Sequence, residues 1–365
     1  MRNEQLTMNN QQQELLEIAQ QYLQQEIAPK ANQIDRQSDK LRVALQGLGK
    51  RNLLALRVPE NLGGAGFSEI EYRQFQIAIA STSGALAFLQ TQHQSAGSFL
   101  VASENQFLQQ QYLPQMSKGK ILIGVGFSQL RRRGKPMMQA REVEGGYLLD
   151  GEVPWITGFD FFDQFIIGAA LPDGRELYGL LPLQTQTQDT SGTILLSQPM
   201  ELIATTATNT VSGKIKQWFL PDQQVVSIKP PNSIHEGSKK NILHHGFFAM
   251  GCAYAALNLL KQIYQKKQLA FLEQSWQQLD RELTICKKKT FQVITQSNSS
   301  DQEKLQLRAW AINLAGRCSQ AAIIATSGAA NYLNSSAGRI YREALLFSVS
   351  GQTTDVMAES LKQLL

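Results

Sequence analysis

The sequence predicts an α+β multidomain protein, in which helices come first, an antiparallel β domain follows and a helix bundle completes the chain. Two observations predict this order. The spacing of apolar residues changes twice, from helical to strand-like near residue 118 and back to helical near residue 229. Residues 229–233 contain two adjacent prolines, which suit a linker between the last two parts. The predicted domains are therefore residues 1–117, 118–228 and 229–365.

The first part of the chain reads as helices that are joined by a glycine-rich loop. Leu15, Ala19 and Tyr22 recur at the spacing of one helix face, and a second stripe of leucines starts at Leu41. Residues 58–67 contain a proline and three glycines, and glycine accepts the positive φ angles of tight turns. We therefore expect a helical domain that is interrupted by this loop.

The middle part reads as a series of short strands. Apolar runs of strand length recur, and Asp-Gly pairs, which favour hairpin turns, stand at residues 150–151 and 173–174. The expected strands cover residues 121–125, 146–151, 165–170, 178–183 and 192–196. Their spacing predicts an antiparallel β domain.

Helical spacing returns after residue 233. Two long helices are expected around residues 242–263 and 269–283. Ser300 stands three residues before Glu303, which is the pattern of a capping box that opens a third helix. Two shorter helices are expected after a break at residues 332–336, so the last part is a helix bundle.

Composition narrows the possible classes of protein. The chain has 365 residues and a net charge of +5, with 42% hydrophobic and 18% charged residues, which is the balance of a folded globular protein. Its basic residues are spread out, so nucleic acid is not an expected partner. Three distant cysteines and the adjacent His244 and His245 give no metal-binding pattern. No apolar run reaches about 18 residues and the first residues are polar, so we expect no membrane span and no secretory signal, and predict a cytoplasmic protein.

Four segments stand out along the chain. They are Val58-Pro59-Glu60-Asn61 with the glycines that follow it, Gln111-Tyr112-Leu113-Pro114, the stretch from Gly146 to Thr157, and Arg342-Glu343-Ala344. In this order they are similar to motifs of the acyl-CoA dehydrogenase family, and the resemblance covers nearly the whole chain. It implies that the C-terminal part is a four-helix bundle and that FAD binds between this bundle and the β domain.

The best functional motif is Trp155-Ile156-Thr157. The resemblance implies that this segment binds the flavin, with the threonine hydroxyl at N5 and the tryptophan beside the ring. The alternative is a strand end with a core tryptophan, which is common in β domains.

The other expected flavin residues come from three places. The resemblance implies Phe127 and Ser128 in the loop after the first strand, Gly328 approaching the FAD of a partner subunit, and Thr353 near the end of the chain. Arg131-Arg132-Arg133 either faces a phosphate or forms a solvated basic loop. For Gly328 the alternative is close packing between helices.

In the family, the catalytic base is a carboxylate that precedes a Gly-Thr pair, shortly after the segment that Arg342-Glu343-Ala344 resembles. Here that position holds Ser350, whose hydroxyl cannot remove an α-proton unaided. Some members carry the glutamate elsewhere, at a position that falls near Asn241, again without a carboxylate. Glu343 and Asp355 are candidates for a displaced base, or else surface or ion-paired residues. His93 is a further candidate because histidine titrates near neutral pH, and its alternative is a structural hydrogen-bonded role.

The resemblance predicts an FAD-dependent oxidoreductase that acts on the CH–CH group of an acyl-CoA or related thioester. Two alternatives stay open: a monooxygenase of the same fold that uses reduced flavin and oxygen, and a scaffold or binding protein without catalysis. The implied partners are further copies of the chain, in a homodimer or homotetramer, and an electron-transfer flavoprotein or a flavin reductase. No metal site is expected.

Overall fold

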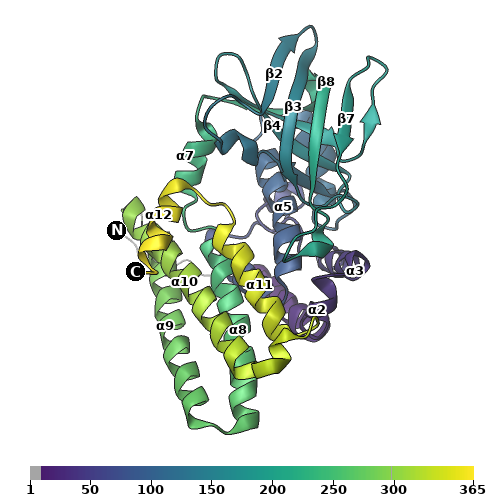
Figure 1. Ribbon diagram of the computed structural model, residues 1–365. Helices are drawn as coiled ribbons and strands as arrows, with labels where there is room; N and C mark the ends of the chain where they lie inside the picture. Colours follow the sequence, from purple (N-terminus) through teal and green to yellow (C-terminus); the bar gives the residue numbers. More distant parts are fainter. Residues whose placement is uncertain (1–9, 297) are drawn as a thin grey trace.

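The structure, a computed structural model, describes residues 10–296 and 298–365 and has the predicted order of helices, sheet and helices. The sheet lies at one end of the molecule and the long C-terminal helices lie at the other (Figure 1). Helix α5 (Gly84–Val101) packs against the first strand and runs toward the bundle, so the N-terminal helices connect the two ends.

The N-terminal helices begin at residues that satisfy their free N–H groups. Before α4 (Glu69–Ala80), the Ser68 hydroxyl accepts the N–H of Ile70 and the Glu71 carboxylate accepts the N–H of Ser68, which is a reciprocal capping box. Helix α5 begins after Ser83, whose hydroxyl accepts the N–H of Leu86. The other elements of this part are α1 (Asn10–Tyr22), the π-helical η1 (Leu23–Ile27), η2 (Ala28–Lys30), α2 (Ala31–Ile34), α3 (Ser38–Gly49), η3 (Glu60–Leu62) and α6 (Gln106–Met116).

The predicted glycine-rich loop packs against α6. Gly63 has a φ of +87°, and a Cβ there would lie 2.9 Å from the Cα of Pro114. A side chain at Gly63 would therefore be strained by both its backbone conformation and its neighbour. The first two of the four sequence motifs, the loop after Val58 and the segment that ends at Pro114, therefore pack against each other.

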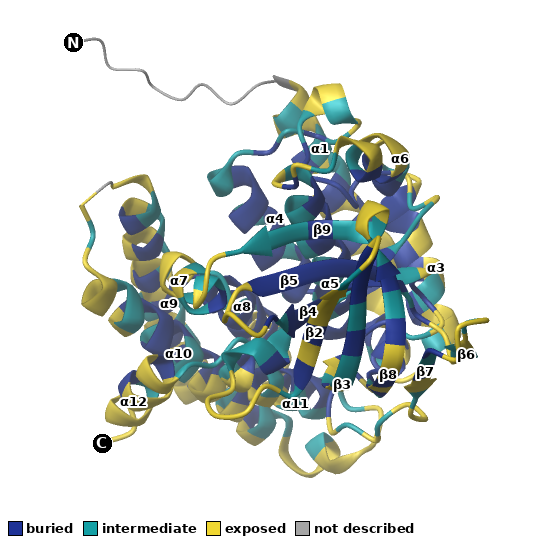
Figure 2. Cartoon of the chain, turned by 90° about the horizontal axis from the view of Figure 1, so that it is seen from above, coloured by how far each residue is buried: buried dark blue, intermediate teal, exposed yellow. Residues whose placement is uncertain are grey.

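The strands within the described residues form one nine-stranded sheet in the order β6-β7-β8-β3-β2-β4-β5-β9, with β1 beside β4. They are β1 (Ile123–Gly126), β2 (Met138–Val143), β3 (Gly146–Ile156), β4 (Gln164–Ala170), β5 (Glu176–Pro182), β6 (Gln186–Thr187), β7 (Thr193–Leu196), β8 (Val211–Pro221) and β9 (Val225–Lys229), with the short helices η4 (Ser128–Arg131), η5 (Thr206–Thr208) and η6 (Asp222–Gln224) between them. Strands β4 and β5 are buried along most of their length (Figure 2).

Most neighbouring strands run antiparallel, as predicted, but two contacts differ. Strand β1 runs parallel to β4, and β2 meets β4 through the parallel pair Gln139 and Ala170. Both contacts join strands that are not linked by a hairpin. Turn signals in the sequence report only hairpin pairs, so they could not predict these two contacts.

The C-terminal part is a helix bundle, as predicted. Its elements are α7 (Ser233–Lys240), α8 (Gly246–Lys267), α9 (Ala270–Thr295), α10 (Asp301–Thr326), η7 (Ser327–Asn331), α11 (Ser336–Val349) and α12 (Thr354–Lys362). Ser300 caps α10 by accepting the N–H of Glu303 at 3.1 Å, so the predicted start of this helix is confirmed. The prediction missed α7, which occupies the chain directly after the two prolines.

A buried ion pair joins α11 to the start of α5. Glu343 is fully buried, pairs with Arg339 at 2.7 Å and accepts the N–H of Gly84 at 3.0 Å. A Cβ at Gly84 would lie 2.7 Å from the Glu343 carboxyl carbon, so only glycine permits this approach. Glu343 therefore holds the N-terminal helices on the bundle.

Candidate functional site

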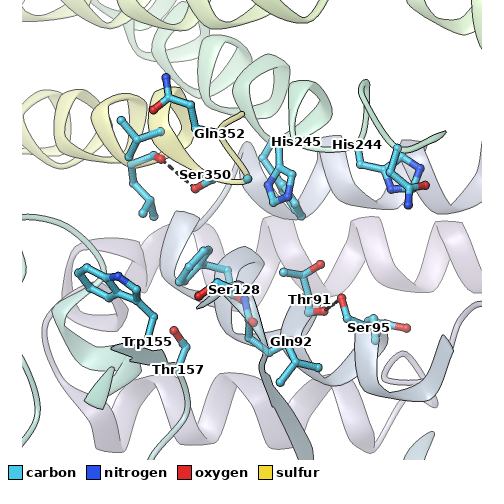
Figure 3. A pocket seen from close by; sticks show the side chains of 18 of the residues that line it. Thr91, Gln92, Ser95, Ser128, Trp155, Thr157, His244, His245, Ser350 and Gln352 are labelled. Carbon is cyan, nitrogen blue, oxygen red and sulfur yellow. Dashed lines mark hydrogen bonds between the residues drawn. The ribbon is translucent and has the colours of Figure 1, made fainter. Parts of the chain in front are cut away.

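A cavity of about 950 Å³ lies between the β domain, α5 and the C-terminal helices. Its walls come from one face of α5, the loop after β1, the end of β3, the start of α8 and the loop between α11 and α12. Figure 3 shows Trp155 and Thr157 on one side of this space, with Ser350 and His245 opposite them. The predicted location of the flavin site, between the β domain and the bundle, is therefore a real cavity.

The predicted flavin motif divides its side chains between the cavity and the core. Trp155 and Thr157 line the cavity, whereas Ile156 is fully buried in the core. This alternation follows from the two-residue period of a strand. Trp155 keeps 49% of its surface exposed, which leaves its ring open to a ligand. The Thr157 hydroxyl lies 3.0 Å from that of Thr210 on the neighbouring chain segment, which fixes its position.

Phe127 and Ser128 also line the cavity, in the loop after β1. The Phe127 ring packs 4.9 Å from that of Phe99, and Gln129 donates hydrogen bonds to the carbonyls of Gly126 and Gly168 that pin the loop. The Ser128 hydroxyl is shielded from solvent and has no hydrogen-bond partner. A shielded hydroxyl without a partner is uncommon, and one in the wall of a cavity is compatible with a ligand that bonds to it.

The arginine triplet is split by the structure. Arg131 lines the cavity and its Nε donates to Ser238 Oγ at 3.2 Å. Arg132 lines the mouth of the cavity but is exposed, and Arg133 is exposed outside it. The triplet is thus neither a single phosphate site nor a uniform solvated loop, because only Arg131 is turned inward and mostly buried.

Ser350 lies in the cavity wall where the resemblance places the base. Its hydroxyl donates to the Leu346 carbonyl at 2.8 Å, so it is engaged with its own helix. The next residue, Gly351, has a φ of +59°, and a Cβ there would lie 2.3 Å from the His245 ring. Arg308 donates to the carbonyls of both Ser350 and Gly351. Arg308 and the close approach of His245 therefore hold this segment in place.

Besides Ile156 and Arg133, five of the predicted site residues lie outside the cavity lining. His93 is fully buried, accepts the N–H of Ile123 at Nδ1 and lies 3.2 Å from the Met116 carbonyl at Nε2, which is the structural role. Glu343 is the buried ion-paired residue described above, Asp355 is exposed in the first turn of α12, and Thr353 caps that helix. Gly328 is exposed, and a Cβ there would meet nothing within 4 Å, so packing within this chain does not require glycine.

Two histidines that the sequence gave little reason to choose line the cavity. His244 Nε2 lies 3.3 Å from Glu69 Oε1, and burial lowers the pKa of His244 to about 4 against the opposing effect of Glu69. His245 has a shielded Nδ1 without a partner, and burial, followed by the nearby Arg308, lowers its pKa well below the ordinary value. Both are neutral at pH 7. The sequence did hold one signal for these histidines. They follow shortly after Asn241, and the region near Asn241 is the second place where members of the family carry the catalytic glutamate.

The cavity fits the group that the resemblance implies. An aromatic wall at Trp155, a fixed hydroxyl at Thr157 and an unpartnered hydroxyl at Ser128 suit a flat heteroaromatic ring with polar edges. The polar atoms converge on the same side of the cavity as Trp155 (Figure 3). The residues present are therefore compatible with FAD.

Two further properties concern only residues 10–296 and 298–365. No helix in this part of the chain is both long enough and apolar enough to cross a bilayer. No three His, Cys, Asp or Glu side chains within these residues gather into a group that could hold a metal ion.

Helices, a β domain and a helix bundle around one cleft, with a Trp-x-Thr strand end in its wall, define the acyl-CoA dehydrogenase class of fold. The sequence model of the family described as "Acyl-CoA dehydrogenase, N-terminal domain" matches residues 9–120. The mitochondrial isovaleryl-CoA dehydrogenase of Pongo abelii is 26% identical over 168 residues, which are 44% of this chain and 40% of that protein. The match thus spans less than half the length of that relative.

Two solved structures share the fold over nearly their full length. Butyryl-CoA dehydrogenase from Megasphaera elsdenii has a TM-score of 0.80 and 13% identity, covering 98% of this chain and 99% of that one. The complex of glutaryl-coenzyme A dehydrogenase with glutaryl-CoA has a TM-score of 0.81 and 16% identity, covering 98% and 96%. The family model, the curated relatives and the solved structures all point to the acyl-CoA dehydrogenase family.

Proposed function

We propose that this protein is an FAD-dependent oxidoreductase that binds the flavin ring against Trp155 and Thr157. The observation that carries the proposal is the unpartnered Ser128 hydroxyl, which faces the same cavity as these two residues. Members of the family generally bind FAD, which supports the same cofactor here. FAD supplies the acceptor or donor of a hydride, and the reaction class implied by the family is at the CH–CH group of an acyl substrate.

The chain's own residues position the reactants. Trp155 covers one side of the ring and excludes water from it, while the Thr157 hydroxyl, fixed by Thr210, supplies a hydrogen bond to its polar edge. Ser128 supplies a second hydrogen bond from the loop that Gln129 holds in place. Substrate then occupies the space between the ring and the Ser350 segment.

The group that would accept an α-proton is the point where this cavity departs from the family. Among the described residues that line the cavity there is no aspartate or glutamate. His245 is the neutral ring beside the Ser350 segment, but its lowered pKa makes it a weak base, so it does not replace the family's carboxylate. The substrate class implied by the resemblance, an acyl-CoA or related thioester, is a proposal that needs a direct test.

The missing carboxylate favours a second candidate function. A monooxygenase that uses reduced flavin and oxygen does not begin by removing an α-proton, so it needs no carboxylate next to the substrate. The same cavity and the same flavin contacts serve both reactions. The electron partner would then be a flavin reductase rather than an electron-transfer flavoprotein.

One experiment separates the alternatives. The purified protein is titrated with FAD and with reduced FAD, and its absorbance is recorded under nitrogen with a panel of acyl-CoA thioesters. Bleaching of the oxidised flavin by an acyl-CoA supports the dehydrogenase. Preferential binding of reduced flavin, with oxygen consumption when a reductase is added, supports the monooxygenase. A colourless protein that binds neither form contradicts the proposal and leaves the scaffold.

A further inference from the structure

Arg308 and His245 contact the Ser350 segment, Arg131 lines the same cavity, and we name these three residues the cationic cluster after the two guanidiniums. Arg131 and His245 line the cavity, and Arg308 lies directly behind it, 3% exposed. Within the described residues, neither Arg131 nor Arg308 has a carboxylate partner within 4 Å. By contrast, Arg73, Arg339 and Arg342 each form an ion pair with a carboxylate. An uncompensated guanidinium away from water is costly.

Arg308 is tied to the backbone rather than to an acid. Its guanidinium donates to the carbonyls of Ile242 at 3.0 Å, Ser350 at 2.8 Å and Gly351 at 2.9 Å. Its Nε is shielded and has no partner, and so is Nδ1 of His245. These contacts fix the charge but do not neutralise it.

The members of the cluster act on one another. Burial, and then the positive charge of Arg131, lower the pKa of Arg308 to about 10. Burial also lowers the pKa of Arg131, whereas the negative charge of Glu176 acts to raise it. The Glu176 carboxylate is already engaged, because it accepts hydrogen bonds from the Tyr178 hydroxyl at 2.8 Å and from the N–H of Ile234. Glu176 therefore opposes the charge of Arg131 only from beyond ion-pair distance, and within the described residues it forms no direct pair with Arg131 or Arg308.

We propose that the cationic cluster binds the carboxylate of an organic-acid substrate, with Arg131 as the direct contact and Arg308 as fixed positive charge behind it. A guanidinium matches a carboxylate through two parallel hydrogen bonds. The neutral His245 ring has an N–H to donate to the same anion. The inference rests on the proposed function for one point, that the flavin ring lies across the cavity from Ser350. The proposal keeps the flavin chemistry of the proposed function but replaces its thioester substrate by one with a free carboxylate at the reacting end.

A carboxylate fits this place better than a phosphate. Arg131 and His245 line the cavity, and His245 lies beside the segment where the resemblance places the catalytic base and hence the reacting carbon. The exposed Arg132 and Arg133 are reached from solvent and suit the phosphates of FAD or of coenzyme A. An anion at the inner position is therefore part of the reacting end of the substrate.

Calorimetric titration of the full chain with paired probes tests this proposal. Butanoate, hexanoate and octanoate are compared with their neutral amides, which have nearly the same shape, both before and after saturation with FAD. We expect each acid to bind at least roughly tenfold more tightly than its amide, because a charge-assisted pair replaces a neutral one. Arg131→Gln should abolish this ratio, and Arg133→Gln, which changes the exposed third arginine, should keep it. Equal binding of acids and amides by the unmodified protein, or a ratio that survives Arg131→Gln, overturns the proposal.

Two additional arms keep the test decisive. Arg131→Lys keeps the positive charge but lacks the two parallel donors of a guanidinium, and it replaces Arg131→Gln if that variant does not fold. An undiminished ratio of acid to amide binding in Arg131→Lys overturns the direct bidentate contact. FAD is compared with riboflavin, and free coenzyme A is titrated, in the same variants. If Arg131→Gln weakens only FAD or only coenzyme A, the anion is a phosphate and the proposal is wrong. If flavin binding is absent but the acid preference depends on Arg131, the anion site stands and the flavoprotein assignment fails.

Discussion

The guanidinium of Arg308 donates a hydrogen bond of 2.8 Å to the carbonyl oxygen of Ser350. The same side chain reaches the carbonyl of Ile242 at 3.0 Å. It thereby joins the two segments in which members of the family place a catalytic glutamate, the one near Asn241 and the one at Ser350. In this chain both segments lack the carboxylate and are held together by a buried cation instead.

Replacing Arg308 by methionine tests how far this link supports the fold. Arg308→Met leaves the carbonyls of Ile242, Ser350 and Gly351 without their donor, and we expect the free energy of unfolding to fall by about 3 kcal/mol. Urea denaturation measures it. Arg317→Met is the matched control, because Arg317 lies on the same helix in an exposed pair with Glu282 and should cost below about 1 kcal/mol. Equal losses in the two variants would show that the three carbonyl contacts are unimportant.

The exposed ring of Trp155 is predicted to carry much of the flavin affinity. Trp155→Ala should weaken FAD binding by on the order of tenfold or more, since stacking on an aromatic wall contributes a few kcal/mol at most. Trp155→Phe should recover part of the affinity. Trp276→Ala is a control on α9, outside the cavity lining. Fluorescence titration gives the dissociation constants, and unchanged affinity in Trp155→Ala would place the flavin elsewhere.

The sequence predicted the site residues that lie close together along the chain, but not those that only tertiary contacts bring together. Trp155 lies at the end of β3 and Thr157 directly follows that strand, so their common side follows from strand alternation carried one residue further. Arg308 and His245 come from the middle of α10 and the start of α8, and neither stands in a motif. The pair meets at Ser350 only because the bundle folds, which no local spacing encodes.

The fold shows the same division between local and distant information. The cap at Ser300 and the apolar runs of β1, β3, β4, β5 and β7 are local, and they were predicted, whereas β2, β6, β8 and β9 were missed. The parallel pairing of β1 with β4 depends on where two distant strands meet, and it was not. The helix α7 was missed because the two prolines before Ser233 read as a linker, although such residues commonly precede a helix start.

His93 is predicted to make stability depend on pH. Burial lowers the pKa of His93 to about 4, below its value in the unfolded chain, so the folded protein resists protonation that the unfolded chain accepts. The stabilisation is complete above about pH 6.5 and is lost as the pH falls toward 4, with a loss of about 2 kcal/mol at pH 5. His93→Gln should reduce this dependence between pH 7.5 and 5 by the share of one histidine, since His244 and His245 retain theirs, while lowering stability at pH 7.5. His235→Gln, on the surface-facing helix α7, should leave the slope unchanged, and an equal slope in all three proteins would contradict the prediction.

Restoring the family's carboxylate at position 350 is predicted to fill the anion site rather than to rescue dehydrogenation. In Ser350→Glu the new carboxylate would face Arg131 and His245 inside the cavity, and the positive charges would hold its pKa low and make it a weak base. We expect acids such as octanoate to bind roughly tenfold less tightly while octanamide is unaffected, because the internal carboxylate competes for Arg131. Ser350→Gln has nearly the same volume without the charge, so it should change acid binding little. If Ser350→Gln weakens octanoate as much as Ser350→Glu does, the loss is steric, and the argument from charge fails.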